Sequence, residues 1–171
     1  MQTIAILINF FFKGVSDFYY ELAVQMIEIC NSMQDRTGGL IYLDQILEKI
    51  RRVRSKFVNE VNEDDCKRAI KKLSIFGNAF TLVSMNNGRY MVQSLPDGMN
   101  VDHTQVLKLA ETHRGIVSHK LVLDELKWDS LRIENVLNSM IKEGIVWVDV
   151  HSTGATLQKN FYFPSLFIDL K

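Results

Sequence analysis

The chain of 171 residues contains only two cysteines and four histidines, and this scarcity excludes several classes of protein. Cys30 and Cys66 both fall at apolar positions of expected helices, which predicts buried thiols. A secreted domain built on a disulfide framework would carry more cysteines. No histidine stands at a metal-ligand spacing from another histidine or a cysteine, and there is no C-x-x-C motif. The sequence therefore predicts no metal site, and the cytosol is the expected compartment.

Catalytic signatures are also missing from the sequence. It contains no G-x-S-x-G motif, no phosphate-binding P-loop and no G-x-G-x-x-G fingerprint. Asp64 and Asp65 are adjacent carboxylates, but neighbouring residues on a helix point to different sides. Their expected role is to stabilise the N-terminal end of a helix dipole. We therefore predict a protein that is not an enzyme and that binds no cofactor.

The chain lacks an excess of charge of either sign. Its formal net charge is zero, with twelve Lys and Arg against ten Asp and Glu in residues 1–95, and eight against ten in residues 96–171. Proteins held on nucleic acid mainly by phosphate contacts usually have a clear basic excess. Neither half shows one, so this composition disfavours nucleic acid as the ligand.

A long hydrophobic run is absent as well. Residues 4–12 are apolar apart from Asn9, a stretch much shorter than the ~20 residues that a membrane span requires. No basic n-region or small-residue cleavage site accompanies it, which argues against a signal peptide. The favoured interpretation is a strand or hinge packed on the first domain. A membrane-touching or poorly ordered tail is the alternative.

What the sequence does contain is an internal repeat. Both copies predict a helix, a short strand, two helices and a hairpin, from the spacing of apolar residues and from capping residues. In the first copy the expected starts are Ser16 or Asp17, Asp44 and Asn62, and Gly39 and Gly77 follow the ends of helices. The first-copy elements are expected at residues 17–36, 40–42, 44–50, 63–76, 80–85 and 90–93.

The second copy repeats this order. Asp102 is expected to start its first helix, Ser118 to cap the second, and Asp129 or Ser130 to cap the third, which ends at Gly144. Two strands are expected at residues 145–150 and 161–163, joined by a polar loop at 151–159. Pro164 is expected to end the last strand, and residues 165–171 to form a short apolar tail.

This order is that of a winged helix, and the sequence therefore predicts an α+β, mainly α protein made of two tandem winged-helix domains. The turn-forming run Pro96-Asp97-Gly98 is the best domain boundary. The predicted division is an N-terminal segment of unclear role at residues 1–15 and domains at 16–95 and 96–171. Because a module of this size buries only ~60% of its unfolded surface, the two should pack on each other or on partners.

Winged helices often place their third helix in the major groove of DNA, so nucleic-acid binding is the alternative function. The third helix of the first copy is expected to expose several basic side chains, and a basic segment precedes it. The same side chains could equally form the solvated face of an amphipathic helix. The corresponding helix of the second copy is nearly neutral, which weighs against DNA. The residues of this alternative are Arg52, Arg54, Lys67, Arg68 and Lys71.

The second copy is rich in aromatic residues, which serve either as interface anchors or as the core of a small domain. Trp147 lies between Val146 and Val148, so one face of that strand must point away from its own core. The same argument applies to Phe161 and Phe163 against Tyr162. Apolar residues on both faces of a strand indicate that something covers one of them.

Several segments, in order along the chain, resemble the Snf-eight or vacuolar-sorting-protein-twenty-two family of ESCRT-II subunits. The resemblance extends from about residue 16 to the C-terminus. The segments in the first copy are residues 17–25 (DFYYELAVQ), 38–41 (GGLI) and 68–73 (RAIKKL). Those in the second copy are residues 99–104 (MNVDHT), 126–128 (LKW), 142–144 (KEG) and 164–167 (PSLF).

The resemblance implies a non-catalytic scaffold subunit of the complex that sorts ubiquitinated membrane cargo into multivesicular endosomes. It implies two partners in a hetero-oligomer. One is the GLUE-domain subunit, contacted by the first domain, and the other is the small subunit, whose proline-aromatic segment docks on the second. Together with the aromatic residues, it predicts a docking site made of Trp128, Trp147, Phe161, Phe163 and Phe167.

The resemblance also implies a location. The expected protein is cytoplasmic and reaches endosomal membranes through the complex, and a described association of the family with an RNA polymerase II elongation factor implies a nuclear pool. Family members usually carry a further N-terminal helical region, which residues 1–13 do not resemble. We therefore expect the membrane to be contacted only through the assembled complex.

Overall fold

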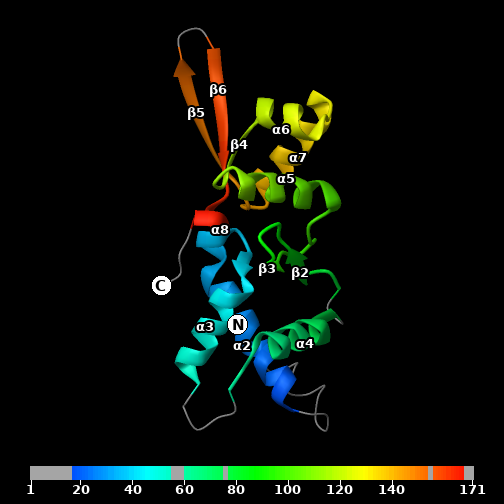
Figure 1. The fold of residues 1–171 in the computed structure, drawn as a ribbon, viewed down its shortest axis with the longest axis vertical. Coiled ribbons are helices and arrows are strands. Elements are labelled where there is room, and N and C mark those ends of the chain that lie inside the picture. The colour runs from blue at the N-terminus through cyan, green and yellow to red at the C-terminus, as the bar shows by residue number, and fades with distance from the viewer. Residues whose placement is uncertain (1–16, 55–59, 75–76, 154–155, 168–171) are drawn as a thin grey trace.

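The computed structural model describes residues 17–54, 60–74, 77–153 and 156–167. These residues fold into two modules stacked end to end, the N-terminal one at the bottom of Figure 1 and the C-terminal one at the top. We call residues 17–95 the first module and residues 96–167 the second module. The N-terminal segment predicted at residues 1–15 lies outside the described residues.

The two modules repeat one order of elements. The first consists of α2 (Asp17–Thr37), β1 (Leu40–Tyr42), α3 (Leu43–Val53), α4 (Glu63–Leu73), β2 (Phe80–Ser84) and β3 (Tyr90–Ser94). The second consists of α5 (Val101–Thr112), β4 (Ile116–Ser118), α6 (His119–Leu126), α7 (Ser130–Lys142), β5 (Trp147–Thr153) and β6 (Thr156–Tyr162), followed by α8 (Pro164–Phe167). The predicted sequence repeat is therefore confirmed as a repeat of structure.

Each module also forms a small antiparallel sheet with the same topology. The strand order is β1-β3-β2 in the first module and β4-β6-β5 in the second, so the short strand pairs with the last strand of the hairpin in both. Three helices with a winged hairpin make up a winged helix. The predicted fold class, α+β and mainly α with two tandem winged helices, is confirmed.

Side-chain caps begin three helices, α4, α6 and α7, at the residues that the sequence predicts. The Asn62 side chain accepts a hydrogen bond from the backbone N–H of Asp65, and the Asp65 carboxylate accepts one from the N–H of Asn62, which completes a capping box. Ser118 caps α6 by accepting a hydrogen bond from the N–H of Leu121, and Asp129 caps α7 by accepting one from the N–H of Arg132. These three polar residues stop the preceding extended segment and satisfy the free N–H groups of the first turn.

Two predicted helix starts are wrong. α3 begins at Leu43 without a side-chain cap, and the carboxylate of Asp44 instead forms an ion pair with Arg89 at 2.7 Å. α5 begins at Val101, and its cap is Asn100, whose Oδ1 accepts a hydrogen bond from the N–H of His103 at 2.8 Å. Asp44 was predicted as the cap and Asp102 as the start of its helix, but both lie in the first turn, where acidic residues are also favourable.

The predicted polar loop at residues 151–159 is also wrong, because most of it is strand. The β5–β6 pairing runs from Trp147 opposite Tyr162 to Thr153 opposite Thr156. The hairpin therefore forms a two-stranded ribbon that projects beyond the helices at the top of Figure 1. Polar side chains on both faces of a projecting ribbon do not prevent pairing, because the backbone hydrogen bonds form whatever the side chains are.

The predicted apolar tail is partly a helix. Residues 164–167 form the single turn of α8, and residues 168–171 lie outside the described part of the chain. α8 contacts α2 and β1, so it packs where the two modules meet (Figure 1).

The sheet of the first module is buried on both faces. Ile41 and Val92 point into the core that α2, α3 and α4 enclose. On the opposite face, Leu40, Tyr42 and Met91 join a second core that continues into α5, α7 and the second sheet. The second module therefore packs directly on the first sheet. The division at residue 96 stays a prediction, since this core crosses it.

Close backbone contact joins the modules at one point. Gly38 follows α2 with a positive φ of 63°, and a Cβ atom placed on it would lie 2.3 Å from the carbonyl oxygen of Gly144. Only glycine allows this approach. A second contact is polar: the backbone N–H of Asn86 donates to the carboxylate of Glu111 at 2.8 Å.

Both cysteines are fully buried in the first core, as predicted. Burial raises the pKa of Cys30 to about 12 and that of Cys66 to about 11. The thiols are therefore protonated at neutral pH and act as small apolar side chains.

Candidate docking surface

A row of apolar side chains crosses the outer face of the second sheet, the face turned away from the core of its module. Ile116 on β4 and Trp147 on β5 both stand opposite Tyr162 on β6. Residues opposite one another point to the same face, and successive residues alternate. Trp147 is 58% exposed and Ile116 36% exposed, while Tyr162 between them is partly buried. The row is thus an exposed apolar strip on a rigid sheet.

Phe167 extends this strip from α8. Its ring centroid lies 6.4 Å from that of Tyr162, and 47% of the residue is exposed. A Cβ atom placed on Gly115 would lie 2.6 Å from the Phe167 ring, so the ring rests directly on that backbone. The buried residues Phe163 and Pro164 hold α8 in place. We call Ile116, Trp147, Tyr162 and Phe167 the outer aromatic patch.

The corresponding face of the first sheet is covered. By strand register, the row equivalent to the outer aromatic patch is Leu40, Gln93 and Thr81, and the next row is Tyr42, Met91 and Val83. Except for Thr81, all of these residues are buried, because the second module packs on that face. Among the described residues, no element covers the same face of the second sheet in this way.

The predicted docking residues divide into two groups. Trp147 and Phe167 are exposed and belong to the outer aromatic patch. Trp128, Phe161 and Phe163 are buried in the core that joins the modules. The prediction is therefore corrected for these three residues: they belong to the core and not to the exposed surface. Alternation is the physical reason, because Phe161 and Phe163 point inward on either side of Tyr162.

The predicted docking residues did not include two members of the patch, Tyr162 and Ile116. The alternation of Tyr162 with Phe161 and Phe163 places it on the opposite face of the strand, but the sequence does not say which of the two faces is inward. Ile116 carried no such signal, since β4 has only three residues and its register on β6 is a tertiary feature.

The basic residues of the nucleic-acid alternative are largely paired with carboxylates. Lys67 lies 2.7 Å from Glu63 and Arg68 lies 2.8 Å from Asp64, each one helical turn away, and Arg52 pairs with Glu48 in the same way. These partners raise the pKa values of Lys67 and Arg68. Each pair is formally neutral and offers little net attraction to a phosphate.

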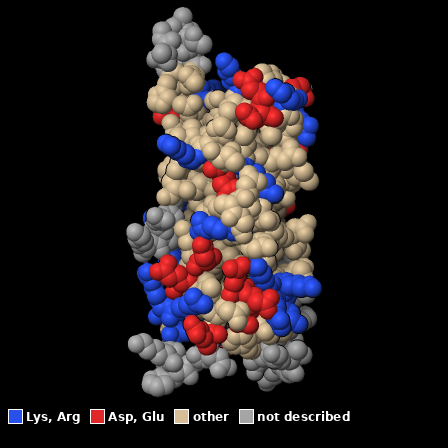
Figure 2. All heavy atoms as spheres, viewed as in Figure 1, with Lys and Arg blue, Asp and Glu red and all other residues tan. Residues whose placement is uncertain are grey.

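Arg54 is the most enclosed of these cations. Only 9% of its side chain is exposed, its guanidinium lies 3.3 Å from Glu21, and its carbon Cζ lies 5.3 Å from the centre of the Phe18 ring. Lys71 is exposed in the last turn of α4. Figure 2 shows blue and red side chains intermingled over the first module, with no continuous basic face in that view.

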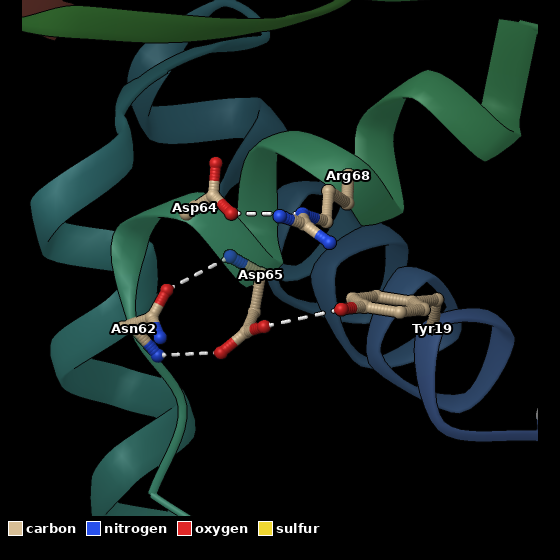
Figure 3. A network of polar contacts seen from close by, with 5 residues as sticks. All are labelled: Tyr19, Asn62, Asp64, Asp65 and Arg68. Atoms are coloured by element: carbon tan, nitrogen blue, oxygen red, sulfur yellow. Dashed lines mark hydrogen bonds and ion pairs between the residues drawn. The ribbon is translucent and has the colours of Figure 1, made fainter.

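The acidic pair at the start of α4 is structural. Figure 3 shows Asp64 turned toward Arg68, while Asp65 is held by the N–H of Asn62 and receives a hydrogen bond from the Tyr19 hydroxyl at 3.4 Å. The two carboxylates thus have separate partners and do not form an acid–base pair. Across the described part of the chain, no cluster of three metal-ligating side chains is found, and no helix is both long and apolar enough to span a membrane.

The sequence matches the model of the EAP30/Vps36 family over residues 3–150. The chain belongs to the EAP30/Vps36 family. The matched span ends within β5, so it includes Ile116 and Trp147 of the outer aromatic patch but not Tyr162 and Phe167.

Curated relatives within this family include vacuolar-sorting proteins. The chain is 43% identical over 157 residues to vacuolar-sorting protein SNF8 of Danio rerio and 42% identical over 157 residues to that of Homo sapiens. It is 39% identical over 152 residues to vacuolar protein sorting-associated protein 22 homolog 1 of Arabidopsis thaliana. These matches cover 92%, 92% and 88% of the chain and 59% of each relative. The chain thus spans about 59% of the length of these relatives.

Two similar solved structures come from the ESCRT-II complex. A chain from the structure of the ESCRT-II endosomal trafficking complex superposes with a TM-score of 0.65 at 29% identity, over 88% of this chain and 66% of that one. A chain from the crystal structure of the endosomal complex ESCRT-II (VPS22/VPS25/VPS36) gives a TM-score of 0.64 at 30% identity, over 87% and 65%. Nothing in these EAP30/Vps36 comparisons supports nucleic-acid binding.

Proposed function

We propose that this chain is a non-catalytic scaffold subunit of ESCRT-II, which sorts ubiquitinated membrane cargo into multivesicular bodies. The proposal is supported by the relatives, which are named as vacuolar-sorting proteins, and by the two similar chains, which come from ESCRT-II structures. The fold agrees with a scaffold role, because a shared core holds the two winged helices in one fixed arrangement.

The second module docks the small subunit of the complex through the outer aromatic patch. The observation that carries this proposal is the difference between the two sheets: the outer face is covered in the first module and left exposed in the second. Exposed aromatic rings on a rigid support suit a proline-aromatic segment, because such segments dock on aromatic-lined surfaces with little loss of conformational entropy. Trp147 and Phe167 are its expected anchors.

The first module contributes the contact with the GLUE-domain subunit. Its exposed helical surface is mostly charged, with residues of both signs on α2, α3 and α4, and Val53 of α3 is exposed among them. Such a surface fits the rim of a hetero-oligomeric interface better than an anchor pocket. Two weak contacts, one at each module, give a high overall affinity when the distance between the modules is fixed. The chain therefore acts by multivalent assembly.

The location follows from this role. The chain acts in the cytoplasm, reaches endosomal membranes through the assembled complex, and has an additional nuclear pool. It is not an enzyme and needs neither a cofactor nor a metal ion.

The test is complex formation with the two other ESCRT-II subunits, followed by size-exclusion chromatography with light scattering. We expect a stoichiometric complex and no shift of duplex DNA at moderate salt. A chain that stays monomeric with both subunits, or that binds DNA with a steep salt dependence, would overturn the proposal.

Single substitutions test the docking surface separately from the assembly. Trp147→Ala should weaken binding of the small subunit by about 30-fold, the effect expected of a central aromatic anchor worth about 2 kcal/mol. Leu131→Ala is the matched control, since Leu131 is 68% exposed but lies on α7. If Trp147→Ala binds as tightly as the control while the complex still forms, the small subunit docks elsewhere.

A further inference from the structure

The outer edge of the projecting ribbon is unpaired among the described residues. The strand order β4-β6-β5 leaves β5 at the edge, and β5 runs for seven residues from Trp147 to Thr153. Figure 1 shows this edge on the side of the ribbon away from α6. Backbone N–H and C=O groups along such an edge are available to another extended chain.

This edge lacks three of the features by which proteins block strand addition, although it does carry the charged side chain of Asp149. Exposed edges are commonly short, bulged, or marked by lysine or proline. β5 has neither lysine nor proline, and its pairing with β6 continues without a bulge from Trp147 to Thr153. Val148 and Val150 are 44% and 49% exposed on the face opposite Trp147. The edge is therefore regular, and one side of it is apolar.

Two polar side chains on this edge, Asp149 and His151, could pair with each other across two copies of β5. Asp149 and His151 point to one face on either side of Val150, and in the single chain their side chains contact each other at 2.9 Å. If two copies of β5 pair antiparallel about Val150, Asp149 of each copy stands opposite the partner's His151. Each copy's Val150 then meets the partner's Val150. A cross-strand pair of β-branched residues is favourable, and an aspartate opposite a histidine forms an ion pair when the imidazole is protonated.

We propose that two copies of this chain associate through the edges of β5. The two sheets then form one continuous sheet of order β4-β6-β5-β5-β6-β4, in which the last three strands belong to the second copy. The contact is isologous, so every favourable pair occurs twice and the dimer closes. A contact of this kind is small and belongs with weak, transient interfaces. The outer aromatic patch lies on the face of the sheet and stays accessible, so a dimer would present two docking surfaces.

The test is sedimentation equilibrium of the chain over a wide concentration range, with variants whose unfolding transitions match the wild type. We expect the average mass of the wild type to rise with concentration toward that of a dimer. Val150→Lys should weaken association by at least tenfold, because it places two lysines opposite each other. Leu131→Lys, a change at an exposed position on α7, is the control and should associate like the wild type.

A charge exchange tests the register. His151→Asp places an aspartate opposite Asp149 of the other copy twice in one dimer, so it should also weaken association at least tenfold. Adding Asp149→His to this variant restores the complementary order and should restore association. A wild type that stays monomeric at every concentration, a Val150→Lys variant that associates normally, or a double exchange without recovery would each overturn the proposal. Binding of an extended peptide by a chain that never self-associates would overturn it too.

Discussion

The close approach of Gly38 to the second module makes a quantitative prediction for Gly38→Ala. Gly38 has a φ of 63°, and its added Cβ would lie 2.3 Å from the oxygen of Gly144 and 2.7 Å from the Cα of Ile145. Both neighbours are backbone atoms, so no side-chain rotation relieves the clash. The left-handed conformation costs an alanine roughly 1–2 kcal/mol, and forced overpacking typically adds about 1–3 kcal/mol.

Gly144→Ala separates these two costs. Gly144 lies on the other side of the same contact with a φ of 74°, but a Cβ atom on it meets nothing within 4 Å. This variant should therefore lose only the conformational contribution, about 1–2 kcal/mol. Gly38→Ala should lose about 1–3 kcal/mol more, a further fall in Tm of roughly 2–4 °C per kcal/mol for a chain of this size.

The assay is urea unfolding followed by circular dichroism, with both variants measured beside the wild type. A greater loss of unfolding free energy for Gly38→Ala than for Gly144→Ala would agree with a rigid contact between the modules. Equal losses would refute the reasoning, since they would mean that the modules separate at this point at little cost.

Four further substitutions test the core, the caps and the ion pairs. Trp128→Ala should lower the free energy of unfolding by about 3–5 kcal/mol because its ring is buried, whereas Trp147→Ala should change it by less than about 1 kcal/mol; thermal unfolding of the two would show which tryptophan belongs to the core. Asn62→Ala should cost about 1 kcal/mol through loss of the capping box, measured as a lower urea midpoint. The hydrogen bonds from Arg132 lower the pKa of Asp102 in the folded state. The contribution of Asp102 to the free energy of unfolding is therefore present at neutral pH and is lost as pH falls through that lowered pKa. The difference in unfolding free energy between wild type and Asp102→Asn should shrink from pH 7 to strongly acidic pH.

Much of the fold could be predicted from the sequence because its signals are local. Asn62, Ser118 and Asp129 cap helices at the predicted positions, since a cap depends only on the next three residues. Asp44 and Asp102 misled because an aspartate is favourable in the first turn of a helix as well as at its cap. The outer part of the ribbon was missed because its residues are polar, whereas the pairing of β5 with β6 depends on backbone hydrogen bonds and does not need apolar side chains.

The docking surface was harder to predict because it depends on packing between modules. Trp128, Phe161 and Trp147 are all large aromatic residues of the second copy, and composition cannot separate them. Burial separates them: the first two lie in the core and the third is exposed. Which face of a strand is inward follows from the helices packed against it, and periodicity leaves that choice open.

The repeat explains why only one of the two sheets leaves an apolar face exposed. Stacked repeats bury their apolar faces against the next unit, so the terminal units need polar surfaces or a partner. In the first module this face packs on the second module, so Leu40, Tyr42 and Met91 are buried. In the second module no described element covers the same face, so Trp147 and Phe167 are exposed, and water solvates them poorly. The absence of a third repeat on the second sheet is therefore the physical reason to propose a partner there.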